Sequence, residues 1–218
     1  MDLLEEEWRL AADFQVQEQV ASLGAFALIA FCGSFRGSEV FLMDLHGLRK
    51  MMEDTKKLGR DHVVITLLGR FKGEQNTRYH LAPLAATTKS RLQVQRWVER
   101  LIEVREKVGR RQGPAFCDRA GEVALSYTYD LGFVERLMTV QAARPDLIPM
   151  EVDISEQFGV SRSFWRGSTS VARTRGVEDR QVELINRWRK VESARGRKPT
   201  LPMKEHYSDI AILVPEMV

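Results

Sequence analysis

Separated basic residues, each at the junction of two predicted elements, precede a tyrosine near the end of the chain. Arg36 follows a predicted buried helix, with Glu39 three residues on, and its guanidinium could pair with an acid while presenting its fork to a phosphate. Lys72 lies at the tip of a predicted hairpin, where a flexible ammonium can reach into a groove. The ordinary alternatives are a structural ion pair for Arg36 and a solubilising role for Lys72.

Basic residues are concentrated in one part of the sequence. Residues 161–204 contain 12 Lys/Arg and four Asp/Glu, a balance of +8, whereas the whole chain is only +3, so the remainder sums to −5. Such a block predicts a phosphate-binding face, since neutralising backbone phosphates releases counterions; a solvated helix surface is the alternative. The residues of this block that we expect to contact DNA are Arg162, Arg187, Arg189 and Lys190.

Other kinds of site are poorly supported by the sequence. The four histidines and two cysteines lack the spacing of metal ligands, and neither Gly-x-x-x-x-Gly-Lys nor Gly-x-Gly-x-x-Gly occurs, so we predict no metal and no cofactor. Cys32 and Cys117 lie in apolar surroundings and are predicted to be buried thiols in a reducing compartment. The longest apolar run, residues 23–32, is too short for a membrane span of about 20 residues.

The elements that must position these residues are mostly helical. Apolar periodicity and capping residues predict helices over residues 2–32, 37–45, 88–108, 129–143, 161–175, 178–191 and 205–214, with a further apolar and basic stretch to residue 57. The β-branched run 62–68 and the alternating run 77–81 predict a hairpin. We therefore expect residues 1–218 to form a single domain, mainly α with a small antiparallel β-hairpin or sheet.

Five motifs occur in a defined order along this chain. They are Phe35-Arg36-Gly37-Ser38-Glu39, the hairpin with Lys72, Ser163-Phe164-Trp165-Arg166-Gly167, Gly176 followed by Arg187-Trp188-Arg189, and His206-Tyr207-Ser208-Asp209. Together they resemble the catalytic domain of tyrosine recombinases (phage-type integrases), and more closely the Crypton-like mobile-element recombinases of eukaryotes, which carry an Arg-Arg-Gly helix and an Arg-Trp motif. The resemblance spans residues 20–212, approximately, and implies that fold.

The resemblance also implies a mechanism. A tyrosine, here Tyr207, attacks a DNA phosphodiester and forms a 3′-phosphotyrosine link, which a free 5′-hydroxyl later reverses, so that neither a metal nor an energy source is needed. By the same resemblance Arg36 and Arg166 bind the phosphate, Lys72 donates a proton to the leaving oxygen and Trp188 packs on the phosphate. This chemistry needs cationic stabilisation where charge develops, together with a general acid and an activated nucleophile.

The sequence departs from the family pattern at its central motif, His-x-x-Arg. Aligning Arg166 with the family arginine places Ser163 at the histidine. The family's usual spacing, counted back from Gly176 and from Trp188, instead lands both times on Trp165, with Arg162 in place of the histidine and Arg166 as the second arginine of Arg-Arg-Gly. We favour this second register. Loss of such a guanidinium typically costs about 3 to 4 kcal/mol of transition-state stabilisation. Either Arg162 or Arg166 compensates from a neighbouring position, or strand cleavage is weak or lost. For Trp165 itself, the alternative is a core aromatic residue.

Two further departures concern the ends of the resemblance. Tyr207 lies 19 residues after Trp188, farther than is usual in the family, and a Gly- and Pro-containing insertion over residues 192–202 would absorb the difference. Otherwise Tyr207 is a plain surface residue. The N-terminal DNA-clamping domain of the family is expected to be absent, because the sequence begins almost directly with the catalytic-type helix.

Three functions follow as hypotheses. The first is a DNA breaking-rejoining enzyme, with full or impaired activity, that self-associates on double-stranded DNA. The second is a catalytically inactive DNA-binding protein on the same scaffold. The third is a helical interaction domain whose basic segment binds acidic protein partners. The first two imply an intracellular protein located with DNA, in a nucleus or in a prokaryotic cytoplasm or nucleoid, and no membrane partner.

Overall fold

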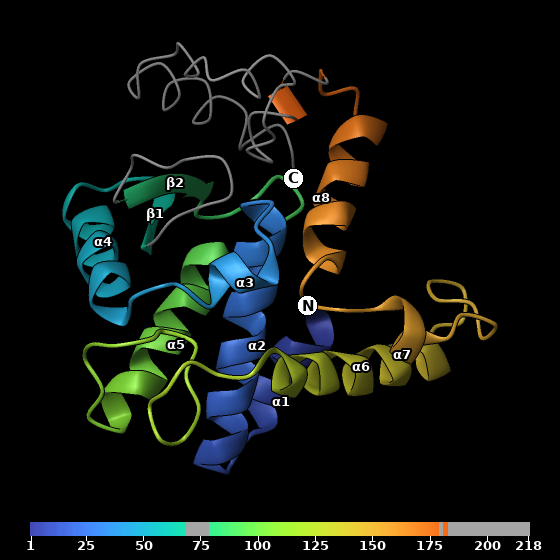
Figure 1. Ribbon diagram of the computed structural model, residues 1–218, viewed down its shortest axis with the longest axis horizontal. Coiled ribbons are helices and arrows are strands. Elements are labelled where there is room, and N and C mark those ends of the chain that lie inside the picture. The colour runs from blue at the N-terminus through green and yellow to red at the C-terminus, as the bar shows by residue number, and fades with distance from the viewer. Residues whose placement is uncertain (69–78, 179–180, 183–218) are drawn as a thin grey trace, which may run out of the picture.

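The structure, a computed structural model, describes residues 1–68, 79–178 and 181–182 (Figure 1). In this part of the chain the prediction of a mainly helical fold with a small antiparallel sheet is confirmed. The elements, in order, are α1 (Asp2–Leu10), α2 (Phe14–Cys32), α3 (Gly37–Val40), α4 (Leu45–Lys57), β1 (His62–Leu68), β2 (Tyr79–Ala85), α5 (Val94–Lys107), α6 (Ser126–Ala143), α7 (Ile154–Gln157) and α8 (Ser163–Thr174).

Helix α2 forms the centre of the molecule because its second half is apolar on every side. From Val20 to Ala30 every residue is buried, and α1, α5, α6 and α8 all pack against this helix. Figure 1 shows α8 on one side of α2 and the sheet with α4 on the other. The contact with α5 is close, since a Cβ atom added to Gly24 would lie 2.1 Å from Cε3 of Trp97.

A cluster of aromatic rings joins α2 to the elements that follow it. The ring of Phe26 lies 5.0–6.1 Å, between centroids, from five other rings: Phe41, Phe116, Tyr129, Phe133 and Phe164. Edge and tilted arrangements at these distances are favourable for aromatic pairs. The cluster therefore fixes α6 and the start of α8 on the central helix.

Two arginines of α5 are buried with partners rather than exposed. Arg100 donates to both carboxylate oxygens of Glu5 at 2.9 and 2.8 Å and lies 4.8 and 4.5 Å from the ring centroids of Trp8 and Trp97, so α1 is held against α5. Arg105, which is 1% exposed, pairs with Glu18 and also donates to the Ser22 hydroxyl and the Ala115 carbonyl.

The hairpin is longer than predicted. Strands β1 and β2 are antiparallel from His62 opposite Ala85 to Leu68 opposite Tyr79, so the second strand continues past the predicted end at residue 81 and through Pro83. Within the described residues the sheet has only two strands, and each is an edge strand, where proline is tolerated. Lys72 and the hairpin tip lie outside the described residues.

Four predicted helix boundaries were wrong, two of them because of a single polar side chain. The helix predicted over residues 2–32 is broken after Leu10, because the Asp13 side chain accepts from the Gln15 amide and starts α2. The helix predicted over 37–45 ends at Val40. Helix α5 begins at Val94 rather than Thr88, whose hydroxyl accepts from the Leu92 amide in a preceding turn. Helix α6 begins three residues before the predicted Tyr129.

The last part of the chain is only partly described. Val182, in the helix predicted over residues 178–191, is 1% exposed and belongs to the core, while most of that helix and all of the one predicted over 205–214 lie outside the described residues. Both cysteines are buried free thiols, as predicted. None of the helices in the described ranges is long and apolar enough to cross a membrane.

Candidate nucleic-acid interface

The start of α8 is held in place by the turn that precedes it. The Val160 amide donates to Asp130 Oδ1 on α6 at 2.7 Å, and the Gly159 amide donates to the Ser163 hydroxyl at 2.9 Å. One residue into the helix, the Phe164 ring packs against Phe133 and Phe158 in the aromatic cluster. These contacts fix the rotation of α8 about its axis, and with it the direction of the residues after Phe164.

Arg36 is positioned by a second turn, at the end of α2. Ser34 adopts a positive φ of 49°. The Arg36 amide donates to Glu39 Oε2 at 2.8 Å, which is the hydrogen bond from the residue that caps a helix to the side chain three positions later. Gly37 lies directly against the turn before α8, because a Cβ atom there would lie 2.5 Å from the Val160 carbonyl oxygen. The segments that carry Arg36 and Arg166 are therefore in backbone contact.

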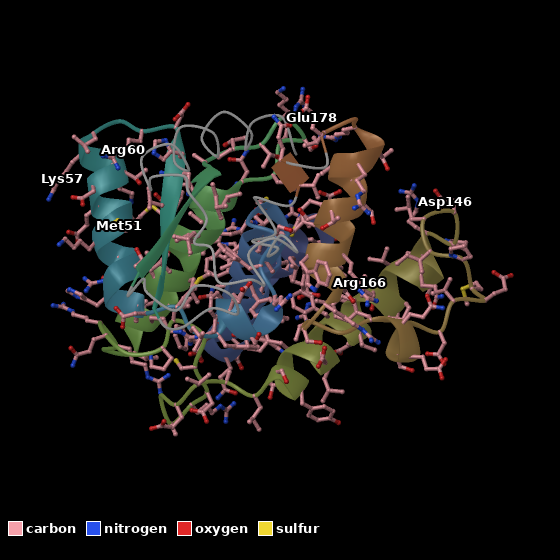
Figure 2. All side chains as sticks on the ribbon, turned by 45° about the horizontal axis from the view of Figure 1, so that its top comes forward. Met51, Lys57, Arg60, Asp146, Arg166 and Glu178 are labelled. Carbon is pink, nitrogen blue, oxygen red and sulfur yellow. The ribbon has the colours of Figure 1, made fainter. Side chains whose placement is uncertain are left out.

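The two arginines meet at the ring of Trp165. The guanidinium carbons of Arg36 and Arg166 each lie 5.9 Å from the centroid of that ring, so they cannot be farther apart than twice this distance. Arg162 is one helical turn before Arg166, on the same side of α8, and both are exposed. Figure 2 shows Arg166 at the end of α8 that faces the centre of the molecule. We call these four residues, Arg36, Arg162, Trp165 and Arg166, the arginine cluster.

The cations of the arginine cluster are available to a ligand. Among the described residues, neither Arg36, Arg162 nor Arg166 forms an ion pair with a carboxylate, whereas Arg49, Arg100, Arg105, Arg136 and Arg144 all do. A guanidinium without a carboxylate partner is a ready donor to phosphate oxygens, so this end of α8 suits phosphate binding.

Trp165 is not a core aromatic residue, which was the alternative that the sequence offered for it. It is only partly buried, while its neighbour Phe164 packs into the aromatic cluster. Its contact with both arginines was not predicted from the sequence. The buried residues of α8 are Ser168, Thr169 and Ala172, and Trp165 lies one turn before Thr169 on the same side of the helix, so periodicity alone does not distinguish Trp165 from a core residue.

The remaining predicted site residues lie outside the described residues. These are Lys72, Arg187, Trp188, Arg189, Lys190 and Tyr207. Of the predicted catalytic residues, the structure thus brings Arg36 and Arg166 together, with Arg162 from the predicted DNA-binding set beside them. Their assignment to phosphate binding stays a prediction.

The described part of the chain offers no metal site, and its Cys32 thiol is not reactive. No group of three or more His, Cys, Asp or Glu residues there could hold a metal ion. Burial raises the pKa of the Cys32 thiol to about 12, so this cysteine is protonated and unreactive at neutral pH. Burial also raises the pKa of the Tyr129 phenol, which belongs to the aromatic core.

Comparisons with known proteins add no assignment. No family model, curated protein or solved structure matches the chain. The resemblance to tyrosine recombinases therefore depends on the order of motifs in the sequence.

Proposed function

We propose that this protein is a DNA breaking-rejoining enzyme of the tyrosine recombinase type, which acts through a 3′-phosphotyrosine intermediate. The observation that carries the proposal is the approach of Arg36 and Arg166 to one ring, although 129 other residues separate them in the sequence. Two guanidiniums without carboxylate partners, brought to one ring from distant segments, support binding of a DNA phosphodiester.

In this proposal the arginine cluster stabilises the charge that develops on the non-bridging oxygens. The Tyr207 hydroxyl gives its proton to solvent and its oxygen attacks phosphorus. The bond to the 5′ oxygen breaks, and Lys72 protonates that oxygen as it leaves and is reprotonated by solvent. Religation is the reverse, with a 5′-hydroxyl as the attacking group. The number of covalent bonds to phosphorus is conserved, so no external energy source is required.

The test is covalent trapping on a nicked duplex, from which the cleaved fragment diffuses away and prevents religation. We expect a protein-DNA adduct that survives denaturing electrophoresis with the unaltered protein and is lost in Tyr207→Phe. The matched control is Tyr127→Phe, an exposed tyrosine on α6. Absence of an adduct with unaltered protein, or an equal yield from Tyr207→Phe, would contradict cleavage.

A second function is favoured by Trp165. If the preferred register is correct, an indole occupies the place of a catalytic guanidinium, and an indole cannot stabilise a charged transition state in the same way. The alternative is therefore a DNA-binding protein that keeps the scaffold without cleavage. It predicts salt-dependent affinity for duplex DNA that drops in Arg36→Ala and Arg166→Ala, with no adduct under any of the trapping conditions.

A further inference from the structure

A second group of exposed cations lies at the other end of α8. Lys89 and Arg91 belong to the turn between β2 and α5, and Arg175 is the C-terminal cap of α8. All three are exposed, and among the described residues none forms an ion pair with a carboxylate. We call these three residues the turn cluster.

The turn that carries Lys89 and Arg91 is ordered by its own hydrogen bonds. The Thr88 amide donates to the Leu92 carbonyl at 3.0 Å, the Arg91 amide donates to the Thr88 carbonyl at 2.9 Å, and the Leu92 amide donates to the Thr88 hydroxyl at 3.0 Å. Thr88 itself is buried. Both cations are therefore displayed from a fixed backbone.

Arg91 has a backbone conformation that is unusual for its residue type. Its φ is +63°, in the left-handed region that favours glycine. An exposed, long charged side chain at such a position is a candidate for a functional role.

The turn reaches the end of α8. Arg175 Nη2 lies 3.4 Å from the Ser90 hydroxyl oxygen, a contact between segments 85 residues apart. Arg175 is nine positions after Arg166, which corresponds to roughly 13 Å along the helix and about half a turn around it. A cation at the C-terminus of a helix complements the helix dipole, which partly accounts for an arginine at position 175. This explanation does not apply to Lys89 and Arg91, which belong to no helix.

We propose that the turn cluster is a second phosphate-binding site for duplex DNA, separate from the arginine cluster. This inference rests on the proposed DNA-binding function and extends the predicted contact surface to a segment outside the basic block 161–204. The major groove of duplex DNA is about 12 Å wide, so cations on opposite sides of α8, roughly 13 Å apart along it, can contact phosphates of the two strands of one duplex. Because no base edge is involved, the site adds affinity without sequence preference.

The test measures affinity for a duplex of about 30 base pairs by fluorescence anisotropy over a series of salt concentrations. The key variant is Arg91→Gly, which removes the charge and suits the positive φ, so that loss of binding cannot be attributed to misfolding. The double variant Lys89→Ala/Arg91→Gly removes two cations. The matched control is Lys57→Ala/Arg60→Ala, which removes two exposed cations at the edge of the molecule away from α8 (Figure 2).

We expect the slope of log affinity against log salt to become shallower by about 0.9 in Arg91→Gly and by about twice that in the double variant. Unrelated duplex sequences should lose affinity equally, and the melting temperature should not fall in Arg91→Gly. An unchanged slope in these variants, while Arg36→Ala and Arg166→Ala weaken binding, overturns this inference alone. An equal loss in the control pair overturns it too. Failure of the unaltered protein to bind duplex DNA overturns the proposed function as well.

Discussion

A guanidinium beside an indole gains about 0.5–1 kcal/mol at an exposed site, because the negative face of the ring attracts the cation. Trp165 provides such a contact to Arg36 and to Arg166. The ring therefore holds two cations near one another when no anion is present. The indole has a single N–H donor, so it cannot bind a phosphate through two parallel hydrogen bonds as an arginine does.

The substitution Trp165→Arg removes the ring that holds the two cations and adds a side chain that can bind phosphate. A third guanidinium should bind phosphate better, so the salt dependence of duplex affinity should steepen by about 0.9. If the register that places Trp165 at the family arginine is correct, the yield of covalent adduct with Tyr207 should also rise. Trp165→Phe, which keeps an aromatic ring, serves as the control.

Both quantities can be measured on the same nicked duplex, by anisotropy and by denaturing electrophoresis. A shallower slope in Trp165→Arg than in the unaltered protein would contradict phosphate binding by the arginine cluster. A steeper slope without any adduct would favour the DNA-binding alternative over the enzyme.

At the scale of elements, the distance between the two arginine-bearing segments is set by backbone contact. Gly37 at the start of α3 faces the Val160 carbonyl, and no flexible side chain lies between them that could move aside. The spacing of the arginine cluster therefore depends on the absence of a side chain at this position. Gly37 carries no charge, so a substitution there changes the spacing of the arginine cluster and keeps all of its cations.

Gly37→Ala should force α3 and the turn before α8 apart. We expect a loss of about 1–3 kcal/mol in the free energy of unfolding, typical of overpacking, and weaker binding of duplex DNA although every cation is kept. Urea denaturation and anisotropy measure the two effects. The control is Gly47→Ala in α4, where the nearest atom would be 3.6 Å away and alanine should stabilise the helix by about 0.5–1 kcal/mol. Full stability and affinity in Gly37→Ala would contradict this account.

The elements were predicted well where the pattern of apolar residues was strong. The apolar stretch of α2 and the β-branched run of β1 gave the correct type of structure. Boundaries failed where a single polar side chain decided them: Asp13 starts a new helix, and Thr88 closes a turn before α5 instead of starting it. Several residues near each boundary can serve as caps, so composition does not show which one is used.

The candidate site was less predictable than the elements. Arg36 and Arg166 were selected by motif resemblance, and their approach depends on how α3 packs against residues 160–161, which no periodicity reveals. The turn cluster was missed, because Lys89 and Arg91 lie far from the basic block and their nearness to Arg175 follows from the tertiary contact with Ser90.

Across the whole molecule, the more deeply buried arginine of α5, Arg105, joins this helix to two distant segments. Arg105 bonds to Glu18 and Ser22 of α2 and to the Ala115 carbonyl in the loop before α6. A buried cation is stable only while it is paired and hydrogen-bonded, so each of these partners depends on it. Its loss should affect global unfolding rather than a local site.

Arg105→Met should lower the free energy of unfolding by about 3 kcal/mol, since it leaves buried acceptors without a donor. The matched control is Arg49→Met, which breaks the more exposed pair with Glu106 and should cost less than about 1 kcal/mol. Urea denaturation followed by circular dichroism measures both variants. Equal costs would show that burial of Arg105 adds nothing.

The fit between Gly24 and Trp97 limits how sequences of this fold can diverge. Any larger residue at position 24 would overlap the indole, and any smaller residue at position 97 would leave a void beside the central helix. Related genes that have drifted at one of these codons should therefore carry a compensating exchange at the other. Paired change at positions 24 and 97 is the evolutionary trace that this helix packing should leave.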